Sequence, residues 1–162
     1  MSSYEDGLAI LEEKFGNGKD NVIALATIAL ETADGKPRPY VRDVDAYYED
    51  GVFYVVTWGE STKMRQIAQN SEVSIAVCFE WFNANGVGEN LGWVLDPKNA
   101  ELRVKLRAAF AAWYDMANNE NDKNCCILAI RLTRGIININ HHEKLYYMDF
   151  VNKTENKAGK FV

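Results

Sequence analysis

The sequence predicts a mainly β fold with α decoration, in which six or seven antiparallel strands form a closed or partly split barrel. Three observations lead to this prediction. Segments rich in β-branched and aromatic residues recur along the chain, tight turn signals such as Asp34-Gly35 and Asp50-Gly51 separate the first of them, and only a few segments have helical periodicity. Closing such strands into a barrel leaves few edges open to other chains.

The first three strands are expected to form a consecutive antiparallel series. Residues 22–30 make a first strand that is apolar on both faces, and residues 38–48 and 52–57 follow after the two Asp-Gly turns. Further strands are expected at residues 73–82, 125–133, 135–142 and 145–150. Residues 83–90 are rich in Gly and Asn and are predicted to be a turn region.

Three helices are expected outside these strands. The first covers residues 1–18, because apolar side chains recur there at helical spacing and a Gly-Asn-Gly stop follows them. A short helix crosses between the third and fourth strands, with Met64, Ile67 and Ala68 on one face. The longest helix is predicted to start at Asp96-Pro97, a capping residue followed by proline, and to continue to Met116.

Length and composition indicate one ordinary globular domain. The 162 residues and 18.3 kDa fit a single domain over residues 1–162, with residues 151–162 as a flexible polar tail. No apolar segment approaches the roughly 18 residues that a membrane span needs, so no membrane partner is expected. The first residues lack the basic start and apolar centre of a signal peptide, which predicts a cytoplasmic location.

Charge and cysteine content exclude several function classes. Eighteen basic residues against 23 acidic ones give a net charge of -5, which disfavours binding to a nucleic acid backbone. The odd count of cysteines without CxxC spacing predicts neither a disulfide framework nor a metal site, and Cys78 is expected to be an inert thiol in the core. No spacing typical of a catalytic nucleophile is present, so no catalytic residue is assigned.

The segment from Thr57 to Lys63 carries the clearest chemical signal. A strand runs directly into a helix that bears the hydroxyls of Ser61 and Thr62 and the cation of Lys63. The first N–H groups of a helix are unpaired and lie at the positive end of its dipole, so this arrangement suits one phosphate monoester. The alternative is that a hydroxyl only caps the helix and Lys63 is solvated.

The order of these elements resembles the FMN-binding split-barrel family, which contains pyridoxamine phosphate oxidases and flavin-binding general stress proteins. Members carry a T-x(3)-S-x-K motif before L-x(2)-N-P-x-V, and the match here covers residues 22–77, closest to the stress proteins. The resemblance implies an FMN-binding split-barrel fold. It also implies that Ser61 and Lys63 hold the FMN phosphate and that Thr57 lies along the flavin.

The same resemblance assigns cofactor contacts to the second strand and to the residue after Thr57. Arg42 stands where the stress proteins carry an arginine, so Arg42 and Val44 are expected beside the cofactor. Asp43 replaces the proline of that pattern, and Thr62 stands where the pyridoxamine phosphate oxidases carry a second phosphate-binding arginine. The alternative for Arg42 is an ion pair with Asp43 or Asp45. Trp58 is expected either over the flavin ring or in the core.

The resemblance implies an FMN-dependent oxidoreductase that transfers hydride at a homodimer interface, with a small-molecule substrate or an electron donor such as NAD(P)H. The chain lacks the arginine-containing C-terminal segment of the pyridoxamine phosphate oxidases, so that activity is not expected. Whether the protein turns over stays open, because a flavin- or haem-binding storage or sensing protein and a cofactor-free dimeric module are alternatives.

Two other cofactors stay open beside FMN. The deazaflavin F420 has a longer acidic tail that needs more cations than the region of Lys63 and Arg42 offers, so FMN is favoured. Haem is the other alternative, because some split-barrel relatives bind haem through a histidine. His141 and His142, at the end of a predicted strand, are the candidate ligands, and a solvated hairpin tip is the other explanation for them.

Overall fold

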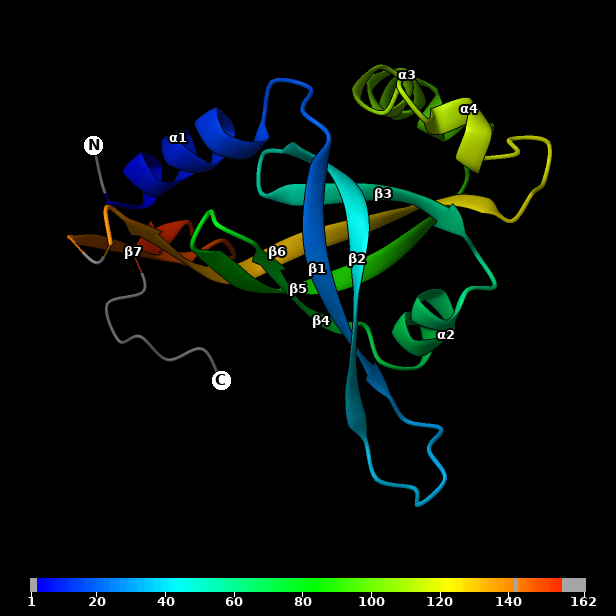
Figure 1. Ribbon diagram of the computed structural model, residues 1–162, viewed down its shortest axis with the longest axis horizontal. Coiled ribbons are helices and arrows are strands. Elements are labelled where there is room, and N and C mark those ends of the chain that lie inside the picture. Colours follow the sequence, from blue (N-terminus) through cyan, green and yellow to red (C-terminus); the bar gives the residue numbers. More distant parts are fainter. Residues whose placement is uncertain (1–2, 142, 156–162) are drawn as a thin grey trace.

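A six-stranded antiparallel barrel forms the centre of the computed structural model, which describes residues 3–141 and 143–155 (Figure 1). Hydrogen bonding follows the order β3-β2-β1-β4-β5-β6, and β3 pairs with β6 to close the ring. The barrel strands are β1 (Asn21–Ala29), β2 (Arg38–Glu49), β3 (Val52–Trp58), β4 (Glu72–Val77), β5 (Phe82–Trp93) and β6 (Cys125–Ile139). Outside the ring, β7 (Lys144–Asp149) pairs with β6 and β8 (Thr154–Glu155) with β7. The predicted mainly β barrel is confirmed.

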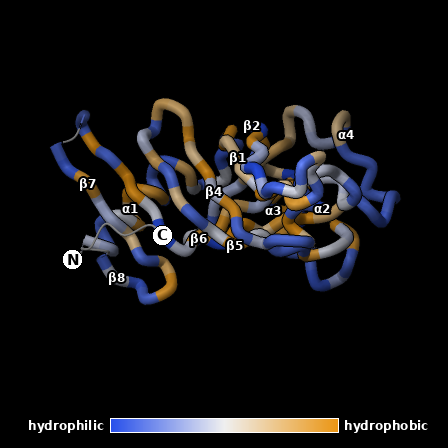
Figure 2. The backbone as a smooth tube through the Cα atoms, turned by 90° about the horizontal axis from the view of Figure 1, so that it is seen from below, coloured by the Kyte–Doolittle hydropathy of each residue, from blue (hydrophilic) through white to orange (hydrophobic). Residues whose placement is uncertain are grey.

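Alternating side chains on the strands fill the barrel. On β1, Ile23, Leu25 and Thr27 are buried, whereas Val22 on the other face is 58% exposed, so the first strand is buried on one face and not on both. The Asp50-Gly51 turn has positive φ at both residues, as a tight turn between twisted strands requires. Figure 2 shows the hydrophobic stretches along the strands and hydrophilic stretches in the connections, such as the one that follows α4.

The first helix, α1 (Ser3–Phe15), packs against the barrel through one face. Tyr4, Leu11 and Phe15 are buried, and the Phe15 ring lies 5.9 Å from the ring of Phe53 and 5.6 Å from that of Phe82. The chain then turns at Asn17 and Gly18, both with positive φ. The predicted first helix is therefore confirmed over Ser3–Phe15, and residues 16–18 form the turn that follows it.

A second layer covers the outer face of β2, β3 and β6. It consists of the 3-10 turn Pro97–Asn99, α3 (Ala100–Ala109) and α4 (Tyr114–Ala117), packed around a separate apolar cluster that includes Leu106, Phe110 and Ile127. The single long helix predicted through Met116 is wrong, and α1 with 13 residues is the longest helix in the described part of the chain. The chain leaves the helix at Phe110, whose fully buried side chain packs in this cluster and stacks on Trp113 with 4.8 Å between the ring centroids.

The predicted turn at residues 83–90 is also wrong, because these residues lie in the middle of β5. This strand is paired on both sides, with β4 and β6. Its glycines serve close packing: a Cβ on Gly86 would lie 2.8 Å from the carbonyl oxygen of Arg131, and one on Gly88 would lie 3.0 Å from Ile67. The turn lies earlier, at residues 78–81, where Phe79 and Trp81 have positive φ.

Three smaller predictions also change. Because β4 ends at Val77, Cys78 is exposed in a turn and is not a core thiol. The strands predicted at residues 125–133 and 135–142 are one strand, β6, since Gly135 lies against Phe82 and Phe150 and makes no turn. Part of the predicted tail is ordered as β8, and residues 156–162 lie outside the described residues.

Two features describe the outside of the molecule. The β1–β2 hairpin extends well beyond the barrel (Figure 1), and Arg38, the first residue of β2, forms an ion pair of 2.6 Å with Asp34 in the connection. No helix within the described ranges is long and apolar enough to cross a membrane.

We predict that Gly86→Ala lowers the free energy of unfolding by about 1–3 kcal/mol, because the added methyl group meets strand backbone that has no free space. Urea denaturation measures the change. Asn83→Ala, at an exposed position of the same strand, is the control and should change stability by about 0.5 kcal/mol or less. If Gly86→Ala is as stable as the control, β4, β5 and β6 are not packed as closely as described.

Candidate functional site

The start of α2 (Thr62–Gln69) is a helix N-terminus that its own side chains leave uncapped. Ser61 occupies the N-cap position with extended backbone angles, φ -66° and ψ 157°, but its side chain makes no capping hydrogen bond. The Ser61 Oγ is buried and has no hydrogen-bond partner among the described residues. Thr62 is exposed in the first turn. Side-chain capping by Ser61, one explanation for this motif, is therefore not what the structure shows.

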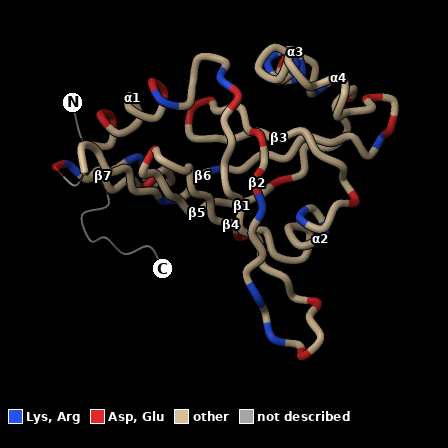
Figure 3. Tube along the Cα trace, in the orientation of Figure 1, with Lys and Arg blue, Asp and Glu red and all other residues tan. Residues whose placement is uncertain are grey.

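Two cations lie beside this helix start. Burial lowers the pKa of Lys63, and the positive charge of Arg42 lowers it further. Burial also lowers the pKa of Arg42. Neither residue forms an ion pair within residues 3–141 and 143–155, so the alternative pairing of Arg42 with Asp43 or Asp45 is absent there. Figure 3 shows basic positions on both α2 and β2. Two partly buried like charges favour a bound anion.

A cavity of about 270 Å³ opens where β2 and β3 separate. The two strands pair only from Tyr47 to Glu49 and from Val52 to Tyr54, and beyond that point β3 is held by β6. The separated parts line the cavity with Val44 and Asp45 from β2 and with residues 55–58 from β3. Lys63 from α2 and Trp113, Ala117 and Asn118 around α4 complete the lining.

Four of the seven predicted site residues meet in this cavity: Val44, Thr57, Trp58 and Lys63. Thr57 is buried, whereas Trp58 is 55% exposed and so is not a core residue. A second pocket of about 230 Å³ adjoins it and shares Thr57, Trp58, Ala117 and Asn118. The exposed indole of Trp58 therefore faces a groove made of both hollows and can stack against a planar ring.

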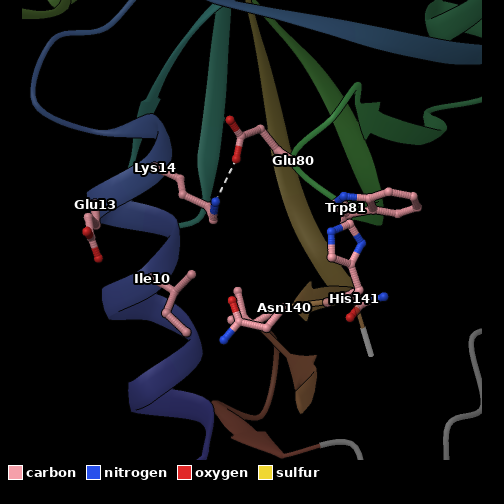
Figure 4. A pocket seen from close by; sticks show the side chains of 9 residues that line it. Ile10, Glu13, Lys14, Glu80, Trp81, Asn140 and His141 are labelled. Atoms are coloured by element: carbon pink, nitrogen blue, oxygen red, sulfur yellow. Dashed lines mark hydrogen bonds and ion pairs between the residues drawn. The ribbon is translucent and has the colours of Figure 1, made fainter. Parts of the chain in front are cut away.

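The candidate haem ligand lies elsewhere. His141 lines a different pocket, of about 370 Å³, together with Ile10 of α1, the 2.6 Å ion pair of Lys14 and Glu80, and Trp81 (Figure 4). Its ring meets the Trp81 ring edge to face at 6.0 Å. Figure 1 places this α1 side and α2 at opposite ends of the molecule. The other candidate, His142, lies outside the described residues.

Comparison with solved structures identifies the architecture. A protein from Listeria innocua, named as a candidate pyridoxamine 5'-phosphate oxidase, superimposes with a TM-score of 0.57 at 15% identity, over 83% of this chain and 96% of its own. General Stress Protein 26 from Bacillus anthracis gives 0.59 at 16% identity, over 85% and 94%.

This chain has the split-barrel fold of the pyridoxamine 5'-phosphate oxidase-like proteins.

The neighbours of this split barrel differ in what their names say they bind. An FAD-binding protein from Mesorhizobium loti matches at 19% identity and TM-score 0.57, over 78% of this chain and 91% of its own. A haem-binding protein from Mycobacterium smegmatis matches at 17% identity and TM-score 0.64, over 94% of this chain but 60% of its own. No family model and no curated protein matches the sequence. The similarity at these identities concerns the fold.

Inside the split barrel, Arg42 fixes α2 to the first two strands. Its Nη1 donates to Thr27 Oγ1 at 2.7 Å and its Nη2 donates to Gln66 Oε1 at 3.1 Å, while the Thr27 hydroxyl also donates to Gln66. Thr27 and Gln66 are both buried. The helix face predicted to be buried included Ala68, which is exposed. It did not include Gln66, which is buried. These bonds position the helix start relative to β1 and β2.

We predict that Thr27→Val and Gln66→Leu each lower the free energy of unfolding by about 1–3 kcal/mol, because each leaves a buried partner without its hydrogen bond. The double variant should lose less than the sum, since both changes remove the same Thr27–Gln66 bond. Urea denaturation measures all three variants. Gln69→Leu, on the exposed side of α2, is the matched control, and equal effects of Gln66→Leu and Gln69→Leu would argue against the buried network.

Proposed function

We propose that this split-barrel protein binds FMN through its phosphate at the start of α2 and acts as an FMN-dependent oxidoreductase. One observation supports this most strongly: the helix start combines the unpartnered Ser61 hydroxyl with a Lys63 that has no acidic partner among the described residues. Unpaired helix N–H groups, a hydroxyl and an ammonium group are the donors that a phosphate monoester accepts.

The residues present fit such a group. Ser61 and Lys63 would hold the phosphate, with the exposed Thr62 hydroxyl beside them. Since the Ser61 Oγ is covered, the side chain must change rotamer to reach the ligand, which is a rotation about one bond. Arg42 has its Nη atoms in contact with Thr27 and Gln66, so it mainly contributes charge and position.

Thr57 and Trp58 would accommodate the ring system. Thr57 ends the buried part of β3, and the half-exposed Trp58 indole in the cavity lining can cover a planar ring and keep water away from it. A bound flavin supplies hydride transfer between a donor such as NAD(P)H and a small-molecule substrate. The chain's own residues bind it, orient it and set the charge around it.

We further propose that the working form is a homodimer. Tyr40 and Val41 on β2 and Trp58 on β3 are apolar side chains that are each more than half exposed. The groove at Trp58 is open to one side, so a second copy would enclose a ring that one chain covers only in part. Exposed apolar side chains are typical of protein–protein interfaces, and one of these three, Trp58, belongs to the cavity lining.

The absorption spectrum of the purified protein tests the proposal. After incubation with FMN and gel filtration, we expect two flavin bands that co-elute with a dimer, and bleaching of the bands on addition of NAD(P)H. An intense haem band would favour the alternative with His141, and a single deazaflavin band would favour F420. Flavin bands that no donor bleaches would indicate storage or sensing, and colourless protein would contradict flavin binding.

We predict that Lys63→Ala weakens FMN binding by about tenfold to a hundredfold, because a charge-assisted hydrogen bond of about 1.5–3 kcal/mol to the phosphate is lost. Quenching of flavin fluorescence measures the dissociation constant. Arg65→Ala removes the same charge two residues on, where Arg65 is exposed and lies 3.6 Å from Glu60, and should change affinity by about twofold or less. Equal losses in the two variants would contradict phosphate binding at Lys63.

A further inference from the structure

The cavity lining includes one carboxyl group, that of Asp45, which interacts with a second carboxyl group outside the lining. Asp45 lines it from β2 and pairs in register with Val22 of β1. Asp20 immediately precedes β1, and its carboxyl interacts with that of Asp45. The Asp20 Oδ2 also accepts a hydrogen bond of 2.7 Å from Nε1 of Trp113, another residue of the cavity lining. One member of this carboxyl pair therefore lines the cavity, and the other is hydrogen-bonded to Trp113 of the same lining.

The surroundings of Asp45 favour its neutral form. Burial raises the pKa of Asp45, and the adjacent Asp20 raises it further through its charge and its hydrogen bond. Asp20 is exposed and accepts the hydrogen bond from Trp113, whereas Asp45 is partly buried. A proton on Asp45 can then lie between the two carboxyls, as in other close carboxyl pairs.

Few charges face Asp45. Lys63 from α2 is the cation of the cavity lining, and the carboxyl group of Asp20 is the acidic neighbour of Asp45. The lining residues from β3 and from around α4 are uncharged: Val55, Val56, Thr57, Trp58, Trp113, Ala117 and Asn118. Ionisation of Asp45 therefore places an additional negative charge in the same cavity as Lys63, where it opposes the attraction of Lys63 for an anion.

We propose that Asp45 is a specificity-determining residue of this cavity, whose neutral form admits an anionic phosphate ester and whose ionised form disfavours it. This inference rests on the proposed function, because it uses FMN as the phosphate ester. Affinity for FMN then depends on the protonation of Asp45, and Asp20 sets the pH at which that protonation changes.

The dissociation constant of FMN, measured by fluorescence from pH 4 to pH 8, tests this in the wild type and in Asp45→Asn. Asparagine is neutral at every pH. The ratio of the wild-type constant to the Asp45→Asn constant should therefore rise from about 1 at low pH to about fivefold at pH 8, the effect of one added charge within a small, partly screened cavity. Taking the ratio removes the titration of the FMN phosphate, which is common to both proteins.

Two further variants complete the test. Asp43→Asn removes the same charge two residues away on β2, outside the cavity lining. The ratio of the wild-type dissociation constant to the Asp43→Asn constant should therefore stay near 1 from pH 4 to pH 8. Asp20→Asn keeps an acceptor for Trp113 but removes the neighbouring charge, so the fall in affinity should move to lower pH while Asp45 stays intact.

A ratio for Asp45→Asn that does not change with pH, or a pH profile that Asp20→Asn leaves unmoved, overturns the inference while FMN binding stands. If the wild type binds no FMN at any pH, the proposed function fails, and this inference fails with it.

Discussion

The pairing of β3 with β6 is the contact on which the rest of the structure depends. It closes the barrel through seven residue pairs, from Val52 with Arg131 to Trp58 with Cys125. Because β2 pairs with β3 only over a short stretch, the part of β3 that carries Thr57 and Trp58 is held by β6 alone. The facing part of β2 is therefore not paired with β3, and the cavity lies between these two separated strand segments. Only residues 59–61 separate the end of β3 from α2, so the same pairing positions the helix start.

Much of the fold could be predicted from local signals in the sequence. The Asp50-Gly51 turn, the alternation along the strands and the amphipathic first helix each depend on residues that are close together in the chain. The wrong predictions concern residues whose structural role depends on contact with a residue far away in the sequence. Gly86 and Gly135 look like turn glycines, but they are small because Arg131 and Phe82 approach them from other strands. The break after Ala109 depends on how Phe110 packs against the barrel.

The candidate site divides in the same way. Four of the predicted site residues lie within a segment of seven residues, so the sequence alone predicts that they are close in space: Thr57, Trp58, Ser61 and Lys63. Gln66 and Thr27 meet through a fold contact across 39 positions, and Asp45 meets Asp20 and Trp113 only because β1, β2 and α4 converge. No periodicity or motif indicates such meetings. Arg42 was predicted beside the cofactor, and the structure adds the hydrogen bonds by which it holds α2.

The unpartnered hydroxyl of Ser61 links folding to ligand binding. A buried polar group without a hydrogen bond destabilises a folded protein by about 1–3 kcal/mol, and the Ser61 hydroxyl has no partner within residues 3–141 and 143–155. Any ligand that satisfies the hydroxyl removes the penalty from the folded state and leaves the unfolded state unchanged. The melting temperature of this protein therefore reports on whatever occupies the start of α2, and a thermal-shift screen of phosphorylated compounds needs no assumption about the reaction.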